Sequence, residues 1–137
     1  MSLVLDSSAT LAWLYPDETS EAIRHVFERV IQEGACVPAL WRIEVANSLL
    51  FGTRRKRITM TERDALLDNL GELVIVTDPD TNAHVWADTL QLADKHRLTV
   101  YDAVYLELAL RLGLPLATLD EALRTAAENE GVTLLGR

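Results

Sequence analysis

Apolar residues along the chain form short compact runs that alternate with longer stretches of helical spacing. The compact runs predict strands at residues 3–6, 35–38, 73–76, 115–118 and 132–135. In the intervening stretches apolar residues recur every three or four positions, which predicts amphipathic helices. We expect these helices at residues 9–15, 20–33, 40–51, from 61 onward, at 83–93, at 100–112 and from 120 onward.

Capping residues predict several of the helix ends. Thr19 or Ser20 is expected to begin the second helix and Gly34 to end it, while Thr61-x-x-Asp64 fits the start of the fourth. The apolar stripes of the second and fifth helices are expected to face the core. They consist of Ala22, Ile23, Val26, Phe27, Val30 and Ile31 in the second helix, and of Ala83, Trp86, Ala87, Leu90 and Ala93 in the fifth.

The alternation of strands and helices predicts the fold. Parallel strands joined by right-handed helical crossovers give a three-layer α/β/α sandwich with a central, mostly parallel sheet. No internal repeat or linker is evident, so we expect a single domain over residues 1–137. Ligands of such sheets bind outside the carboxyl ends of the strands, and we expect the chemistry there.

The amino-acid composition and net charge exclude some classes of function. With 49% apolar and 25% charged residues the chain has the composition of a globular protein. It has neither a bilayer-length apolar stretch nor a signal-like start, which predicts a cytoplasmic protein without membrane contact. The net charge of −8 argues against general electrostatic binding of nucleic acid, but not against a nuclease with an acidic, metal-filled site.

Cysteine and histidine offer no evident metal site. The single cysteine, Cys36, lies in an apolar run and is expected to be a small core residue. The three histidines, His25, His84 and His96, show no ligand spacing and are expected on surface faces, which argues against zinc.

An acid stands near the start of the apolar run VYDAVYLELAL. At helical spacing Asp102 shares a face with Tyr105, whereas Glu107 and Arg111 point to the opposite side, which is expected to be wet. Thr99-x-x-Asp102 also fits a capping box. Asp102 is therefore either a capping residue or part of a functional site, because a carboxylate on an apolar face needs a partner.

Three further acids occupy comparable positions. Asp6 and Asp120 each follow a predicted strand, where either could cap the next helix or face the ligand crevice. Glu44 lies on an inward face of its helix, opposite Arg42. Clustered carboxylates repel one another unless a cation lies among them, and their hard oxygen atoms suit Mg²⁺ or Mn²⁺. We therefore expect Asp6, Glu44, Asp102 and Asp120 to form one metal-binding catalytic site.

Several stretches resemble the PIN-domain family, and more narrowly its VapC-type ribonuclease toxins. They are LVLDSSATLAWL, VPALWRIEVANSLL, and LADKHRLTVYDAVYLELALRLGLPLATLDEAL. The resemblance implies metal-dependent cleavage of RNA, with the acidic positions of the family at Asp6, Glu44, Asp102 and Asp120 and a supporting hydroxyl at Thr118. It also implies a VapB-like antitoxin partner and a homodimer.

The expected reaction is attack on an RNA phosphodiester by a water activated by Mg²⁺ or Mn²⁺. In this scheme Ser8 and Thr118 orient carboxylates or contact a phosphate oxygen, and Asn47 supports Glu44. The one dense basic run, at Arg54, Arg55, Lys56 and Arg57, either binds RNA or complements the end of a helix.

Two other functions fit part of the pattern. A phosphate-handling domain with an acidic pocket would carry paired acids after the first strand and a lysine at a late strand end, but Asp6 is followed by serines and the late strands end without lysine. A non-catalytic binding module of the same fold would have no need for four clustered acids.

Overall fold

The computed structural model describes residues 2–137, and its core is a parallel sheet of five strands. In spatial order the strands are β3 (Ile75–Thr77), β2 (Ala35–Val37), β1 (Val4–Leu5), β4 (Leu116–Ala117) and β5 (Leu134–Leu135). All four neighbouring pairs run parallel. Strands β1 and β2 are buried throughout, as expected for the central strands of a sheet covered on both faces.

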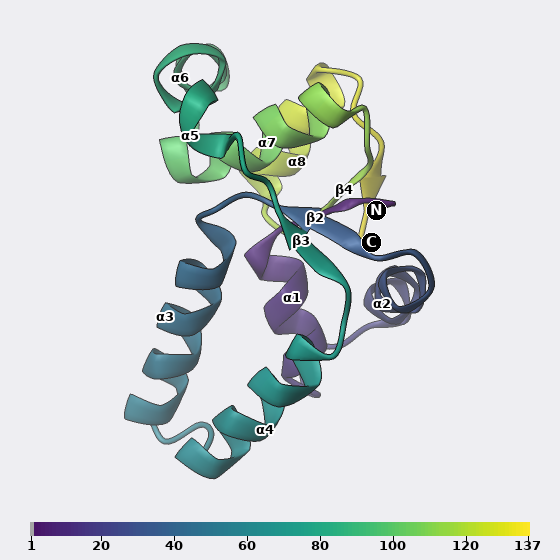
Figure 1. Ribbon diagram of the computed structural model, residues 1–137, viewed down its shortest axis with the longest axis vertical. Coiled ribbons are helices and arrows are strands. Elements are labelled where there is room, and N and C mark those ends of the chain that lie inside the picture. The colour runs from purple at the N-terminus through teal and green to yellow at the C-terminus, as the bar shows by residue number, and fades with distance from the viewer. Residues whose placement is uncertain (1) are drawn as a thin grey trace.

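Helices lie on both sides of this sheet (Figure 1), which confirms the predicted three-layer α/β/α sandwich. The α-helices are α1 (Ser7–Leu14), α2 (Glu21–Glu33), α3 (Trp41–Arg54), α4 (Met60–Gly71), α5 (Thr81–His84), α6 (Leu90–His96), α7 (Val100–Leu112) and α8 (Glu121–Asn129). Helices α7 and α8 cover one face, and α1 and α2 pack together beneath the other. In residues 2–137 no helix is long and apolar enough to span a bilayer.

Most of the predicted helix ends are confirmed, and one is wrong. Ser20 caps α2 by accepting a hydrogen bond from the amide of Ile23, and Gly34 ends this helix with a φ of 75°. Helix α4 begins two residues earlier than predicted, because a capping box is formed by Thr59 and Glu62 instead of Thr61 and Asp64.

The predicted apolar stripe at residues 83–93 is also wrong, except at Ala93, which is buried. The segment divides into α5, a π-helix η1 (Val85–Thr89) and α6, so its faces do not follow a continuous α-helical period. Trp86 is 92% exposed and Leu90 is exposed, whereas Thr81 and Thr89 are buried. In α2 the predicted stripe holds except at Ile31, which is exposed.

The register of the central strands determines which residues meet at the carboxyl edge of the sheet. Leu5 of β1 pairs with Ala117 of β4, so the following residues, Asp6 and Thr118, emerge side by side. Cys36, on β2, is a buried core residue as predicted. The first and last thirds of the chain therefore build the centre of this edge together.

Candidate active site

Asp6 is held at the end of β1 by hydroxyl groups that are far apart in the sequence. Ser8 donates a hydrogen bond to Oδ2 of Asp6 at 2.6 Å, and Thr118 donates one to the same oxygen at 2.7 Å. The Asp6 side chain is buried and Thr118 is fully buried. These two donors fix the orientation of the carboxylate, because both hydroxyl groups belong to rigid elements next to the sheet.

Glu44 lies in the first turn of α3 and meets α7. The Tyr105 hydroxyl, on α7, donates a hydrogen bond to Oε1 of Glu44 at 2.5 Å. The Ser7 hydroxyl lies 3.4 Å both from Oε1 of Glu44 and from Oδ1 of Asp6. Ser7 therefore connects the two carboxylates, and Tyr105 determines the position of Glu44.

Asp102 and Asp120 lie at the N-terminal ends of α7 and α8. The Thr99 hydroxyl accepts a hydrogen bond from the amide of Asp102 at 3.1 Å, and Oδ1 of Asp120 accepts one from the amide of Leu123 at 2.8 Å. Asp120 is also joined to the Asp6 hydrogen bonds, because its amide donates to the Thr118 hydroxyl. Asp120 thus caps α8 with one carboxylate oxygen, as the sequence allowed, and the residue is partly buried.

The four predicted acids act on one another electrostatically. Burial raises the pKa of Asp6, and the negative charge of Asp120 adds to the rise. Burial raises the pKa of Glu44, with further contributions from the charges of Asp6 and Asp102. Burial also raises the pKa of Asp102, and Asp120 and Asp6 add to it. We call these four acids, whose charges act on one another, the acidic quartet.

The acidic quartet offers a donor set that suits a hard cation. Carboxylate oxygens are the ligands that Mg²⁺ and Mn²⁺ prefer, and a dication would relieve the repulsion among these groups. Within residues 2–137, no three members of the quartet each bring a carboxylate oxygen within 4.8 Å of the others. Mg²⁺ commonly binds one or two carboxylates directly and retains several waters, so the quartet fits such an ion.

The other predicted residues differ in how close they come to the quartet. Ser8 contacts Asp6, and its hydroxyl also accepts a hydrogen bond from the amide of Leu119 at 2.9 Å. Asn47 lies one turn beyond Glu44 but its side chain is exposed on α3.

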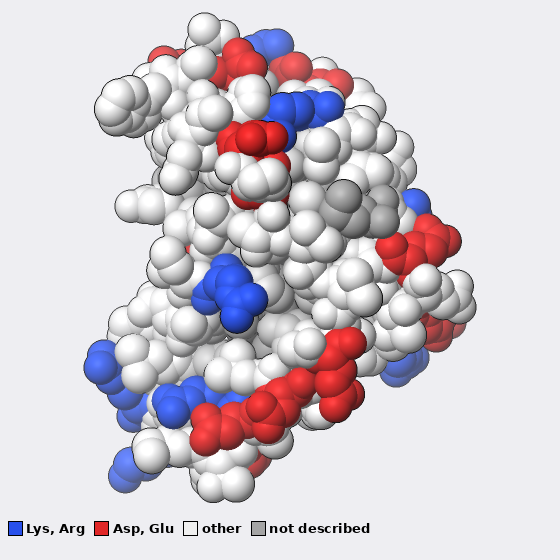
Figure 2. All heavy atoms as spheres, viewed as in Figure 1, with Lys and Arg blue, Asp and Glu red and all other residues white. Residues whose placement is uncertain are grey.

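The basic run at the end of α3 divides into two parts. The guanidinium groups of Arg54 and Arg55 lie 5.9 and 5.7 Å from the centre of the Phe51 ring, and both side chains are exposed. Lys56 is also exposed, in a left-handed backbone conformation with a φ of 60°. Figure 2 shows basic side chains at the lower left, over this end of α3, beside an acidic strip that follows α4.

Arg57 is occupied by contacts within the chain. Its NH2 group lies 2.9 Å from carboxylate oxygens of both Asp17 and Glu18, and its guanidinium lies 3.7 Å from the centre of the Tyr15 ring. Arg57 would have to leave these partners to bind RNA.

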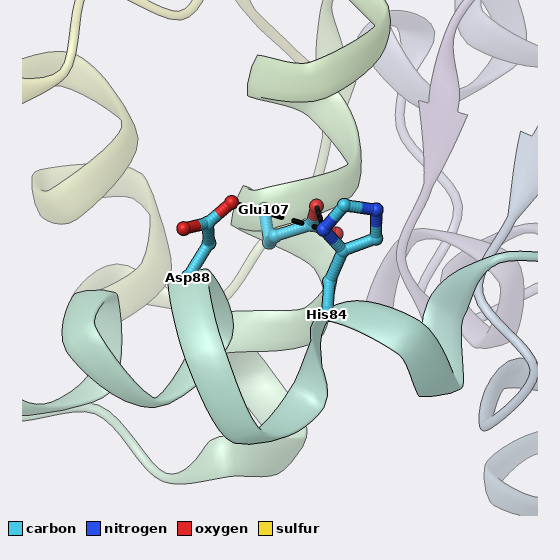
Figure 3. A group of neighbouring side chains, drawn as sticks. All are labelled: His84, Asp88 and Glu107. Atoms are coloured by element: carbon cyan, nitrogen blue, oxygen red, sulfur yellow. Dashed lines mark ion pairs between the residues drawn. The ribbon is translucent and has the colours of Figure 1, made fainter.

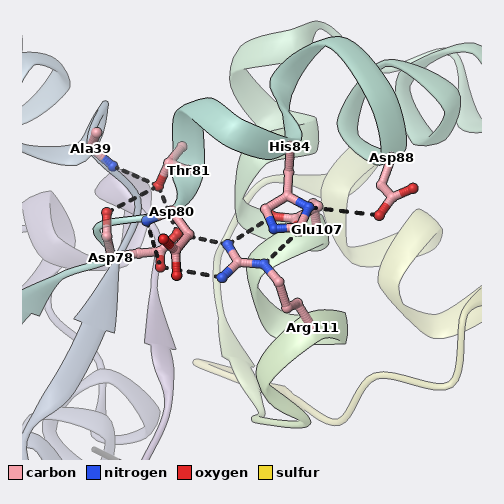
Figure 4. Close-up of polar contacts among 8 residues, drawn as sticks. All are labelled: Ala39, Asp78, Asp80, Thr81, His84, Asp88, Glu107 and Arg111. Atoms are coloured by element: carbon pink, nitrogen blue, oxygen red, sulfur yellow. Dashed lines mark hydrogen bonds and ion pairs between the residues drawn. The ribbon is translucent and has the colours of Figure 1, made fainter.

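Asp78 is an acid at the carboxyl edge that the sequence reading did not select. Like Asp6, Asp78 directly follows a strand, and this placement could have been predicted from the sequence. The residues that bind its carboxylate could not. Arg111 binds both oxygens of Asp78, at 2.6 and 3.2 Å, and Thr81 donates a hydrogen bond at 2.8 Å (Figure 4). Burial alone would raise the pKa of Asp78, but the hydrogen bonds from Arg111 and Thr81 hold it below its usual range.

The expected wet side of α7 is in fact a buried ionic cluster. The side chain of Glu107 is only 4% exposed, because Arg111 and His84 cover it. Arg111 lies 2.7 Å from Oε1 of Glu107, four residues earlier in the same helix, a spacing that the sequence did contain.

The prediction that all three histidines lie on the surface was wrong for two of them. His84 is half-buried beside Asp88 and Glu107 (Figure 3). The His96 side chain is 8% exposed and lies 2.7 Å from Glu130. Only His25 is exposed as expected.

Known proteins match this chain over nearly its whole length. The model of the PIN domain family matches residues 3–129. Ribonuclease VapC3 from Pyrobaculum aerophilum is 37% identical over 125 residues, which cover 90% of this chain and 92% of the relative.

Two crystal structures have the same fold. That of PAE2754 from Pyrobaculum aerophilum aligns with a TM-score of 0.71 at 23% identity, covering 98% of this chain and 83% of the other. That of FitAcB from Neisseria gonorrhoeae aligns with a TM-score of 0.66 at 18% identity, covering 96% and 95%.

Proposed function

Because this chain belongs to the PIN domain family, we propose that it is a metal-dependent endoribonuclease that acts as the toxin of a toxin–antitoxin pair. One observation carries the proposal. Asp6 and Glu44, both with raised pKa values, are joined through Ser7 at the carboxyl edge of the sheet, and the charges of Asp102 and Asp120 act on the same site. The similarity to a ribonuclease over 90% of the chain supports RNA as the substrate.

The acidic quartet would hold Mg²⁺ or Mn²⁺, which supplies a water of lowered pKa and positive charge for the phosphate. Ser8 and Thr118 bind Oδ2 and keep Asp6 in one orientation, so that Oδ1 lies beside the Ser7 hydroxyl, which also contacts Glu44. The Tyr105 hydroxyl holds Glu44 in place, and its hydrogen bond offsets part of the rise that burial causes in the pKa of Glu44. No side chain is needed as a covalent nucleophile.

The basic end of α3 gives the acidic chain a place to hold the RNA backbone. Arg54, Arg55 and Lys56 are exposed there and follow the helix that carries Glu44. Their charge would offset the repulsion between phosphate and a protein of net charge −8. Arg57, which is bound to Asp17 and Glu18, contributes less.

An antitoxin partner would neutralise the site with a cationic side chain. A guanidinium matches carboxylates in a bidentate manner and would take the place of the metal among Asp6, Glu44 and the other acids. The body of the partner could pack as a helix in the apolar groove between α3 and α4. That groove has a volume of about 390 Å³ and is lined by Trp41, Val45, Leu67, Leu70 and Ile75 among others.

The nuclease proposal is tested by incubating purified protein with total cellular RNA and Mg²⁺ or Mn²⁺. We expect cleavage that a chelator abolishes and that Asp6→Asn or Asp102→Asn removes. Asp68→Asn, which changes an exposed acid on α4, serves as the matched control and should retain full activity. Full activity of either quartet variant would contradict the mechanism, and the absence of cleavage in every condition would favour a non-catalytic binding module.

The toxin proposal is tested separately by growth. Expression of the chain in a bacterial host should slow growth, Asp6→Asn should not, and co-expression of the adjacent small reading frame should restore it. Equal effects of the wild type and Asp6→Asn on growth would contradict the toxin assignment and leave the nuclease proposal standing.

A further inference from the structure

His84, Asp88 and Glu107 bring three possible metal ligands together outside the acidic quartet. His84 is the last residue of α5, Asp88 lies in η1 and Glu107 in the middle of α7. Nδ1 of His84 lies 3.5 Å from Oε1 of Glu107 and 3.7 Å from Oδ2 of Asp88, and the three ligand atoms all lie within 4.8 Å of one another. Figure 3 shows the three side chains pointing toward one another.

These separations match a shared ion. Zinc binds nitrogen and oxygen ligands at about 2.0–2.2 Å, so that two ligands at a tetrahedral angle lie roughly 3.4 Å apart. In residues 2–137 this is the one group of three histidine, cysteine or acidic residues that meets the 4.8 Å limit. A small rotation of the exposed Asp88 side chain would close the remaining gap.

The negative charges near the cluster are only partly offset within the chain. Asp78 and Glu107 share the single guanidinium of Arg111, and in the described part of the chain Asp88 has only the His84 ring beside it. Arg111 is bound to both Asp78 and Glu107 (Figure 4), and its Nε donates to Oε1 of Glu107, the oxygen that faces His84, so its guanidinium orients Glu107. A carboxylate can accept about four hydrogen bonds or ligand contacts, so Glu107 can bind Arg111 and an ion together.

The cluster opens onto a pocket that leaves room for the remaining ligands. The pocket has a volume of about 640 Å³, and its lining includes His84, Asp88, Glu107 and Arg111. Three protein ligands with an accessible fourth position can be completed by water. The Glu107 side chain, which is more than nine-tenths buried, forms the inner wall of this pocket.

We propose that His84, Asp88 and Glu107 form a second divalent-cation site, of the transition-metal class represented by Zn²⁺, that joins η1 to α7. A histidine nitrogen with two carboxylates favours Zn²⁺ and related ions over Mg²⁺, in contrast to the all-carboxylate quartet. The ion would stabilise the protein by binding only its folded state.

The test is titration of chelator-treated, dialysed protein with Zn²⁺ by calorimetry, with the thermal midpoint followed in parallel. In excess Mg²⁺, added to occupy the acidic quartet, we expect one equivalent of Zn²⁺ to bind and raise the midpoint, and His84→Gln and Asp88→Asn to weaken this binding at least tenfold. Asp88 is 67% exposed, so Asp88→Asn should fold normally even if His84→Gln does not. The midpoint of each variant in chelator checks the fold.

Two controls separate this site from the others. Asp6→Asn should bind Zn²⁺ as the wild type does, whatever its effect on RNA cleavage, so failure here is distinct from failure of the nuclease proposal. His96→Gln alters a histidine that has a single carboxylate partner beside Lys95, and should also leave binding unchanged. The proposal would be overturned by unchanged Zn²⁺ affinity in Asp88→Asn, by loss of Zn²⁺ binding in Asp6→Asn, or by no Zn²⁺ binding to the wild type. The group would then be a cluster of ion pairs and not a metal site.

Discussion

The hydroxyl of Tyr105 and the carboxylate of Glu44 meet at 2.5 Å, so that α7 determines the position of an acid on α3. The two residues are far apart in the sequence, and Tyr105 is itself fully buried. Burial raises the pKa of the Tyr105 hydroxyl, which therefore stays protonated and acts only as a donor to Glu44.

Tyr105→Phe should weaken both the fold and the proposed activity. Loss of the hydroxyl removes a hydrogen bond to a charged group, which costs about 1–3 kcal/mol. Because the Tyr105 hydrogen bond lowers the pKa of Glu44, its loss should raise that pKa and move the acidic limb of the pH–activity profile to higher pH. Tyr101→Phe, at an exposed position on the same helix, is the control. Identical pH profiles for Tyr105→Phe and the wild type would show that the contact is only structural.

The acidic quartet should make the metal-free protein less stable as the pH rises. Asp6, Glu44 and Asp102 have pKa values above their ordinary range, so the folded state holds protons that the unfolded state has released. The free energy of unfolding contributed by these groups is therefore present below their ordinary pKa and lost as pH rises through the folded values. Denaturant unfolding in chelator at several pH values measures this loss.

Asp6→Asn should reduce this dependence on pH, because it removes one buried carboxylate and its effect on the others. Mg²⁺ or Mn²⁺ should restore stability to the wild type at neutral pH more than to Asp6→Asn. An equal pH dependence in the two proteins would contradict the coupling among the acids.

Arg111 should be far more important to stability than the other paired arginines. Arg111→Ala would leave Asp78 and Glu107 buried without their cation, and breaking such a pair costs about 3–5 kcal/mol. Arg111→Lys should recover only part of this loss, because lysine cannot bind Asp78 in a bidentate manner. Glu33→Gln breaks the exposed pair of Arg29 and Glu33 at 4.0 Å but leaves the hydrogen bond from Arg29 to the carbonyl of Ser2, and should change the free energy of unfolding by less than about 1 kcal/mol. Similar losses for Glu33→Gln and Arg111→Ala in denaturant unfolding would argue against this account.

Arg54 and Arg55 should contribute to the salt dependence of RNA binding, whereas Arg57 should contribute mainly to stability. Replacing Arg54 and Arg55 together by Gln should flatten the salt dependence of binding by about 0.7–0.9 units per lost phosphate contact. Arg57→Gln should mainly lower stability, since its guanidinium is bound to Asp17 and Glu18. Binding to a single-stranded RNA, measured at several salt concentrations with an inactive Asp6→Asn background, gives the slopes. A slope unaffected by the double change would assign Arg54 and Arg55 to the helix end alone.

The layers of the fold could be predicted from short stretches of sequence. Much of the candidate site could not, because it depends on how the helices pack. Strand runs and caps such as Ser20 and Gly34 are encoded over a few residues, and they predicted the element order well. The cap at Thr59 was missed because Thr61 offered a similar local pattern. The exposure of Trp86 was missed because the π-helical turn changes the spacing at which residues return to the same helix face. The amino-acid sequence of this segment does not predict such a turn.

Candidate site residues were visible in the sequence to different degrees. Asp6 and Asp120 follow strands, so a sheet topology alone brings them to one edge. The contact of Tyr105 with Glu44 depends on how α3 and α7 pack, which no short-range pattern specifies. Glu107 appeared to belong on a wet face because it is charged, but Arg111 and His84 allow it to be buried.

The pairing of β1 with β4 has a consequence for how the protein is made. Thr118, which helps to fix the carboxylate of Asp6, is synthesised more than a hundred residues after it. Until then β1 has no β4 to pair with, and of the two hydroxyl donors to Oδ2 of Asp6 only Ser8 is present. A nascent or prematurely terminated chain that ends before β4 should accordingly lack the ordered acidic site, so that the proposed nuclease would be assembled only after β4 has been translated.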